Sequence, residues 1–206
     1  MKKVLLVLTA ITVTTLSYAQ VQFGVKAGVN IATVTGSGAN SDNIPGKTSL
    51  INFNAGGLVS IPVSGSFSVQ PELVYSGQGV KGSEDGESET VNLSYLNVPI
   101  LAKYMIASGF SVEAGPQIGF LLSAKEKVTE GSSSATTTIP NTNSVDFSIA
   151  AGVSYLLSSN NLGFDARYNI GLTNVNSGAG ASSDEIKNGV IQIGVFYMFG
   201  GKTSGK

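Results

Sequence analysis

The sequence predicts an all-β protein, an eight-stranded antiparallel up-and-down barrel whose strands cross a membrane. Three observations lead to this prediction. Hydrophobic residues alternate with small or polar ones in eight separate segments. Short turns alternate along the chain with long polar connections. Charged residues make up only 12% of the chain while 42% is hydrophobic, and this charged share is about half that of a soluble domain.

Alternation with a period of two residues is typical of β-strands. From Val21 to Ile31 the odd-numbered residues are apolar and the even-numbered ones are small or polar. Pro71 and Pro116 fall inside such segments, where a ladder donor is lost, and we expect β-bulges there. The eight segments are residues 21–31, 51–63, 67–75, 96–106, 110–122, 145–157, 162–172 and 191–199.

The connections between these segments differ in length. Three of them, at residues 64–66, 107–109 and 158–161, have the composition of tight hairpin turns. Short turns, long loops and an even number of strands of about ten residues are features of outer-membrane barrels. We therefore expect the short turns and both chain ends on the periplasmic side and four loops outside. The four expected outer loops are residues 34–49, 78–92, 123–143 and 174–188.

Alternation alone would also fit a soluble barrel with an apolar interior. The apolar faces contain no charged residue, and the opposite faces are mostly Gly, Ser, Asn and Gln. Such a face has too little charge for a solvent surface, but its side chains are small enough to fill a narrow lumen. Aromatic residues gather near the short turns, as in a girdle at the lipid headgroups. The expected girdle is Phe23, Phe67, Tyr104, Phe110, Tyr155, Phe164, Tyr197 and Phe199.

Six charged residues occupy the small face. Their positions along the strands place them in one layer, roughly 7–12 Å from the short-turn end. The layer is neutral, and Lys103 can lie between Glu72 and Glu113, because the three come from consecutive strands. It could form a buried ion network that plugs the lumen or a gated ion path. We favour the plug, because eight strands leave room only for side chains. The six residues are Lys26, Glu72, Lys103, Glu113, Asp165 and Arg167.

Composition argues against several classes of site. The chain has no histidine and no cysteine, which are the commonest general base and the thiolate metal ligand. The acidic run at residues 84–89 lacks the spacing of an EF-hand and is interpreted as a solvated loop. A formal net charge of −1 provides no basic surface for nucleic acid. We predict no catalytic residue, no cofactor and no metal site.

The first 19 residues predict a cleavable signal peptide. Lys2 and Lys3 precede an apolar core at residues 4–16, and Ser17-Tyr18-Ala19 has the small-x-small pattern of a cleavage site. The apolar core is too short to span a membrane as a helix. We expect residues 1–19 to be removed and residues 20–206 to form one barrel domain in the cell outer membrane.

Several segments resemble a known family. They are FGVKAGVN at residues 23–30, QPEL at 70–73, LNVPILAKY at 96–104, EAGP at 113–116 and GVFYMF at 194–199. They resemble the outer-membrane β-barrel domain of PorT-like proteins and of small OmpA- and OmpX-like barrels, over about residues 21–199. The resemblance implies insertion by the outer-membrane assembly machinery, which recognises an aromatic last strand, here ending at Phe199.

These observations leave three functional hypotheses. The leading one is a small non-enzymatic barrel surrounded by outer-membrane lipids, whose outer loops interact with the surroundings or with other envelope proteins. The second is a narrow transport channel or a PorT-like secretion-system subunit. The third is a lipid-modifying enzyme, which the missing histidine argues against.

Overall fold

A computed structural model describes residues 21–39, 44–84, 87–140, 142–157, 159–176 and 185–199. The predicted signal peptide lies outside the described residues. No helix in the described part of the chain is long and apolar enough to cross a membrane. The elements are β1 (Gln22–Thr35), the 3-10 helix η1 (Ser37–Ala39), β2 (Thr48–Ser64), β3 (Phe67–Glu84), β4 (Glu87–Ala107), β5 (Phe110–Glu130), β6 (Ser133–Thr138), β7 (Val145–Leu156), β8 (Leu162–Gly171) and β9 (Lys187–Phe199).

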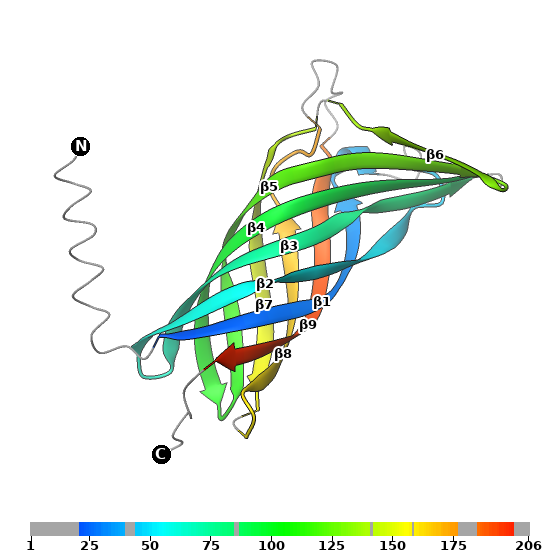
Figure 1. Cartoon of the computed structure of the whole chain (residues 1–206). Helices are drawn as coiled ribbons and strands as arrows, with labels where there is room; N and C mark the ends of the chain where they lie inside the picture. Colours follow the sequence, from blue (N-terminus) through cyan, green and yellow to red (C-terminus); the bar gives the residue numbers. More distant parts are fainter. Residues whose placement is uncertain are drawn as a thin grey trace.

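Eight of these strands form a closed ring (Figure 1). Each strand pairs antiparallel with its neighbour in the chain, and β1 closes the ring by pairing with β9. The predicted eight-stranded up-and-down barrel is therefore confirmed. The strand β6 is an addition outside the ring, because it pairs only with the far end of β5, over residues 125–130.

The two faces of each strand meet different surroundings. On β1, Phe23, Val25 and Val29 are 59%, 48% and 47% exposed on the outer surface, while Lys26 and Asn30 on the opposite face are buried in the lumen. The same alternation continues around the ring. Because the ring is closed, each strand has a neighbour on both sides that can hydrogen-bond to its backbone N–H and C=O groups. A strand in lipid needs these partners, because lipid tails offer none.

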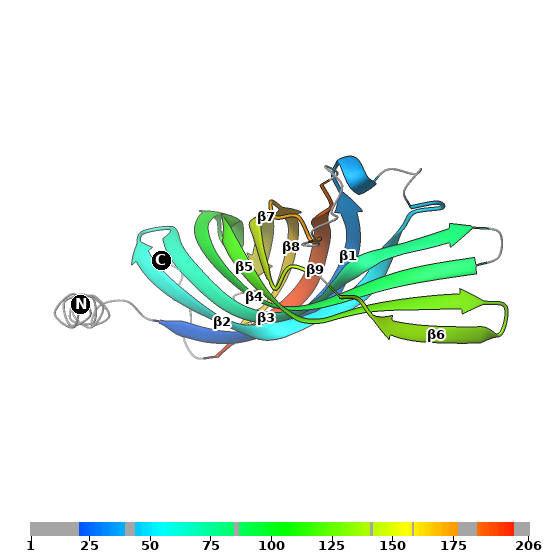
Figure 2. The same ribbon diagram turned by 90° about the horizontal axis from the view of Figure 1, so that it is seen from above.

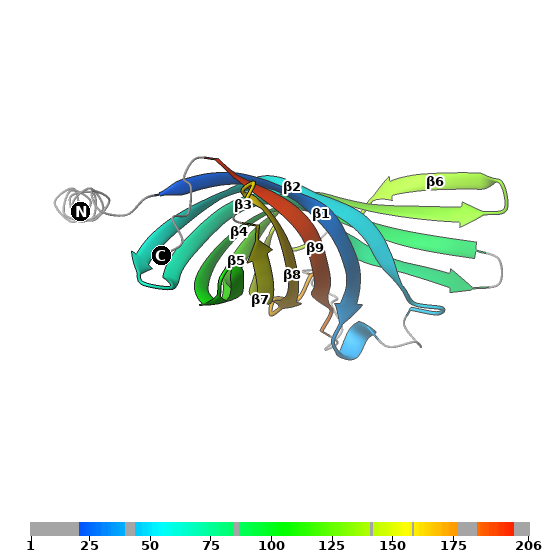
Figure 3. The same cartoon turned by 90° about the horizontal axis from the view of Figure 1, so that it is seen from below.

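Two of the predicted outer loops are largely β-structure. β3 extends to Glu84, β4 begins at Glu87 and β5 extends to Glu130, so the expected loops at 78–92 and 123–143 are wrong for most of their length. The extended ends of β3 and β4, together with β5 and β6, continue beyond the ends of β1, β7, β8 and β9 (Figures 2 and 3). We propose that this part lies on the outer side of the membrane and call it the extracellular sheet: residues 79–84, 87–94, 123–130 and 133–138.

The expected bulges at the two prolines are also wrong. Pro71 pairs with Ile100 and Pro116 pairs with Ile149, and the register is the same on both sides of each proline. The missing N–H removes a rung of the ladder without inserting an extra residue, so the strands stay in phase. The register shifts instead lie between Ser49 and Asn54, Pro62 and Ser64, Ser94 and Tyr95, and Met105 and Ala107.

Candidate functional site

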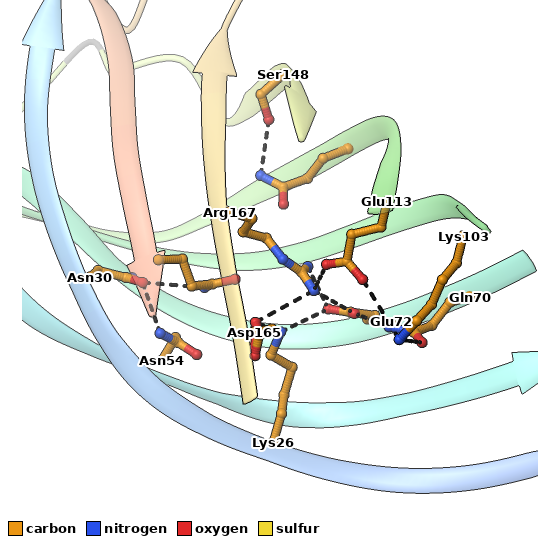
Figure 4. A network of polar contacts seen from close by, with 12 residues as sticks. Lys26, Asn30, Asn54, Gln70, Glu72, Lys103, Glu113, Ser148, Asp165 and Arg167 are labelled. Atoms are coloured by element: carbon orange, nitrogen blue, oxygen red, sulfur yellow. Dashed lines mark hydrogen bonds and ion pairs between the residues drawn. The ribbon is translucent and has the colours of Figure 1, made fainter. Parts of the chain in front are cut away.

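The structure brings all six lumen charges together (Figure 4). They come from five strands, and each occupies an inward position in the alternation of its strand. Five of the six are 4% exposed, and the side chain of Lys103 is 14% exposed. Lys26 and Arg167 contact carboxylates that are far apart from them in the sequence, and these contacts depend on closure of the barrel.

Arg167 on β8 is the centre of the network. Its Nη1 and Nη2 each donate to one oxygen of the Glu72 carboxylate at 2.9 Å, which is a two-pronged contact. Nη2 also forms ion pairs with Glu113 Oε1 at 2.9 Å and with Asp165 Oδ2 at 3.7 Å. One guanidinium group thus contacts all three carboxylates, which the fixed fork of arginine allows.

The two lysines lie on either side of this centre. Lys26 Nζ donates to Asp165 Oδ2 at 2.9 Å and to Glu72 Oε2 at 3.5 Å. Lys103 Nζ lies 3.8 Å from Glu113 Oε2 and donates to Gln70 Oε1 at 3.5 Å. The expectation that Lys103 bridges Glu72 and Glu113 is wrong, because Arg167 occupies that position and has the longer, forked side chain.

A layer of amides and hydroxyls lies farther into the lumen. Asn30 Nδ2 donates to Ser76 Oγ at 2.9 Å and to Gly77 O at 2.8 Å. Its Oδ1 accepts from Asn54 at 2.8 Å and from Gln192 at 3.2 Å. Sequence analysis recognised that the inward face carries such residues, but it did not identify this cluster, because the contacts depend on register.

Apolar side chains fill the short-turn end of the lumen. Leu58, Phe196 and Met198 form a buried cluster, with Leu156 packed against it. The Phe196 ring lies against Gly163, where a Cβ atom would collide with the ring. Lys103 Nζ lies 5.2 Å from the centre of the same ring. Sequence analysis missed this cluster, although Phe196 and Met198 stand at inward positions of the last strand.

Farther toward the outside, Leu93, Tyr95 and Ala124 form a second buried apolar cluster. Beside it lies a fourth buried acid, which sequence analysis missed. Asp146 on β7 is 5% exposed and has no ion-pair partner among the described residues. The side chains that fill the lumen thus extend well beyond the predicted charge layer.

The eight expected girdle residues all point outward near the short turns. Phe23 pairs with Phe199, Phe67 with Tyr104, and Tyr155 with both Phe110 and Phe164, so they form neighbouring pairs around the ring. The exposed fractions of these eight side chains range from 36% to 59%. We propose that they lie at the periplasmic headgroup boundary, where amphipathic and aromatic rings are favoured.

A second aromatic belt, which sequence analysis missed, lies farther from the short turns. Its members Phe53, Phe120, Phe147 and Tyr168 are 41–56% exposed, and Phe53 stacks on Tyr75 with ring centres 5.1 Å apart. The two belts are about ten positions apart on β5, from Phe110 to Phe120. Ten residues span about 33 Å along a strand and roughly 23 Å across a membrane at a 45° tilt, close to the apolar band of about 25 Å in such barrels.

The extracellular sheet carries a pair of adjoining acids. Glu89 lies diagonally across β4 and β5 from Glu126, as their paired residues Val128 and Val91 show. A side-chain hydrogen bond to Glu126 raises the pKa of Glu89 above its ordinary value, and partial burial and the neighbouring negative charge raise it further. A proton held between the two carboxyls relieves their repulsion.

The described side chains form ion pairs and pack against one another, and they offer little further chemistry. They contain no group of three or more His, Cys, Asp or Glu side chains placed to hold a metal ion. The six charges of the predicted layer are paired with one another and largely removed from solvent, so the arrangement can hold strands together and obstruct the lumen.

An antiparallel ring with an apolar outer face, aromatic belts and a filled polar lumen defines a transmembrane barrel of the outer-membrane type. The chain belongs to the outer membrane protein β-barrel domain family, whose model matches residues 17–177. This membership implies that the protein resides in the outer membrane.

Solved structures show the same fold. The attachment invasion locus protein Ail of Yersinia pestis is 15% identical with a TM-score of 0.51, and the match covers 86% of this chain and 98% of Ail. The Neisserial surface protein NspA is 16% identical with a TM-score of 0.52, covering 86% of this chain and 97% of NspA. No curated protein matches the chain.

Proposed function

We propose that the protein is a closed, non-enzymatic outer-membrane barrel that anchors the extracellular sheet and presents it for interactions with the surroundings or with other envelope proteins. The observation that carries this proposal is the filled lumen: apolar clusters lie on both sides of a paired layer of charges. Because the lumen is filled by side chains, the observation supports a function for the parts of the chain outside the membrane rather than for the interior of the barrel.

The rival hypothesis of a narrow channel can be tested by conductance. We expect the purified chain to give no steady current in planar lipid bilayers. The variant Phe196→Ala/Met198→Ala removes two side chains of the periplasmic apolar cluster and leaves the ion pairs in place. Comparing its current with that of the wild type measures how much this cluster obstructs the lumen. A steady single-channel current from the wild type would refute the closed barrel.

The orientation can be tested by labelling, since the chain contains no cysteine. Thr136→Cys places a thiol on β6, and Ser66→Cys places one in the turn between β2 and β3; both positions are exposed. A maleimide that cannot cross membranes should label residue 136 on intact cells and residue 66 only after the cells are permeabilised. Labelling of residue 66 on intact cells would reverse the proposed orientation.

The extracellular sheet can be shortened without opening the ring. Ile139 N donates to Ala124 O at 3.1 Å, so two glycines replacing residues 125–138 can connect these neighbouring positions. The shortened chain should fold and keep its heat-modifiable gel mobility, but it should no longer co-purify with the envelope proteins that bind the full chain. Unchanged co-purification of those proteins with the folded, shortened chain would refute a role for this part of the sheet.

Export is proposed to follow cleavage after Ala19, with Gln20 as the first mature residue. The intact mass of the protein purified from outer membranes measures this directly. A secretion-system role is not favoured by any contact in the described residues. An enzymatic role would require a nucleophile beside a base, and the six charged side chains of the layer are paired with each other.

A further inference from the structure

Charge is divided between the two faces of the extracellular sheet. Paired residues on neighbouring strands point to the same face. The inward face continues the lumen, as buried Val80, Leu93 and Ala124 show, and the outward face continues the apolar outer surface of the barrel. Every described acid of the sheet is on the inward face, namely Glu84, Glu87, Glu89, Glu126 and Glu130, and every lysine is on the outward face, namely Lys81, Lys125 and Lys127.

The three lysines form one group. Lys81 on β3 pairs with Thr90 on β4, and Thr90 pairs with Lys127 on β5, so the two lysines are two strands apart, or about 10 Å. Lys125 lies two residues from Lys127, about 7 Å along the same strand. All three are exposed, and none has an ion-pair partner in the described part of the chain.

The neighbours of these lysines on the outward face are hydroxyls and amides. Asn92 pairs with Lys125, and β6 places Thr136 beside Lys127 and Thr138 beside Lys125. The face therefore presents ammonium groups and neutral hydrogen-bonding groups, with no carboxylate among its described residues to compete for the lysines. Its charge complements an anion that can also accept hydrogen bonds.

The lysines also lie just beyond the membrane band. Lys125 is five residues past Phe120, the last aromatic residue on the outer face of β5. Five residues advance roughly 12 Å outward at a 45° tilt, while the headgroup zone of one leaflet is about 5–8 Å thick. A lysine side chain can bend back by several ångströms along the surface, so these ammonium groups reach the headgroups.

We propose that Lys81, Lys125 and Lys127 bind the phosphate groups of outer-leaflet lipids and thereby hold the outward face of the extracellular sheet against the membrane surface. The inward acids then face away from the lipid phosphates and avoid their repulsion. This inference rests on the orientation in the proposed function but not on a closed lumen, so a conducting barrel would leave it intact.

The test measures lipid binding to the full-length folded chain in neutral detergent by native mass spectrometry. The probes are lipid A with two phosphates and the same lipid with both phosphates removed. A lysine near an anionic surface contributes roughly a five-fold gain in affinity. We therefore expect Lys81→Gln/Lys125→Gln/Lys127→Gln to weaken binding of the phosphorylated lipid by about 100-fold, and the change of all three to arginine to preserve it.

The matched control is Lys187→Gln, which removes a lysine that lies outside the sheet and is paired with Glu185 at 2.5 Å. The affinity of this control variant for the phosphorylated lipid should equal that of the wild type. Equal binding of both lipids by the wild type, or unchanged binding by the triple glutamine variant, would overturn the proposal. Displacement of the lipid by an equal concentration of inorganic pyrophosphate would also overturn it, because the site would then select a soluble anion. Gel mobility before and after heating checks that each variant is folded.

Discussion

Removal of the Arg167 side chain should destabilise the barrel more than any other single substitution in the charged layer. Arg167 contacts Glu72, Glu113 and Asp165, and its side chain is 2% exposed. The variant Arg167→Met retains much of the apolar stem but leaves three acids with two lysines. The layer then carries one unpaired negative charge in a region from which water is largely excluded.

Breaking a buried ion pair by removing one partner lowers the free energy of unfolding by about 3–5 kcal/mol. We expect Arg167→Met to fall in this range, and Arg167→Lys to lose less because the charge remains while the fork to Glu72 is lost. Adding Glu113→Gln to Arg167→Met restores neutrality. The double variant should therefore be more stable than the sum of the two single changes predicts.

The assay is reversible urea unfolding in detergent micelles, followed by far-ultraviolet circular dichroism, which suits a chain without tryptophan. The gel shift between unheated and heated samples gives an independent measure of the folded fraction. A loss below about 1 kcal/mol in Arg167→Met, the range of exposed ion pairs, would refute a tightly paired network. So would strict additivity in the double variant.

Three further results are expected. Lys103→Ala should lower the unfolding temperature in detergent only slightly, with a loss of about 1 kcal/mol, because Lys103 is partly exposed and its nearest carboxylate is 3.8 Å away. Gly163→Val should displace the Phe196 ring and reduce the free energy of unfolding by roughly 1–3 kcal/mol, and adding Phe196→Leu should recover part of this loss. Because folding raises the pKa of Glu89, protonated Glu89 stabilises the extracellular sheet. This stabilisation is fully present below the ordinary pKa of 4.5 and is lost as the pH rises through the raised pKa. Amide protection factors in β4 and β5, which are corrected for the intrinsic pH dependence of exchange, should therefore be higher at about pH 4 than at neutral pH. The variant Glu89→Gln should flatten this difference, and protection factors with an unchanged pH dependence in that variant would contradict the shared proton.

The ring was predictable because lipid imposes a simple rule on each strand. An outward residue must be apolar and an inward one must fit a narrow lumen, so alternation in segments such as 21–31 indicated both the strands and their faces. The inward position of each charged residue followed from the same rule, which is why all six could be named before their contacts were known.

The extracellular sheet was missed because the rule changes beyond the membrane. There both faces meet water or headgroups, and polar residues at 78–92 and 123–143 have the composition of loops. A pattern was nevertheless present: Lys125-Glu126-Lys127-Val128 alternates charge rather than hydrophobicity. The partners within the network were missed for another reason, since which cation reaches which carboxylate depends on side-chain length and on register across the closed ring.

The wide sequence separation of the paired charges has a consequence for assembly. Lys26 and Asp165 are 139 residues apart, and Arg167 and Glu72 are 95 apart. A partly formed barrel that lacks β8 would expose Glu72, Glu113 and Lys26 without their strongest partners, on a surface that has to enter lipid. We therefore expect late strands to be needed before early ones become stable in the membrane, so that insertion is a concerted closure rather than a strand-by-strand addition.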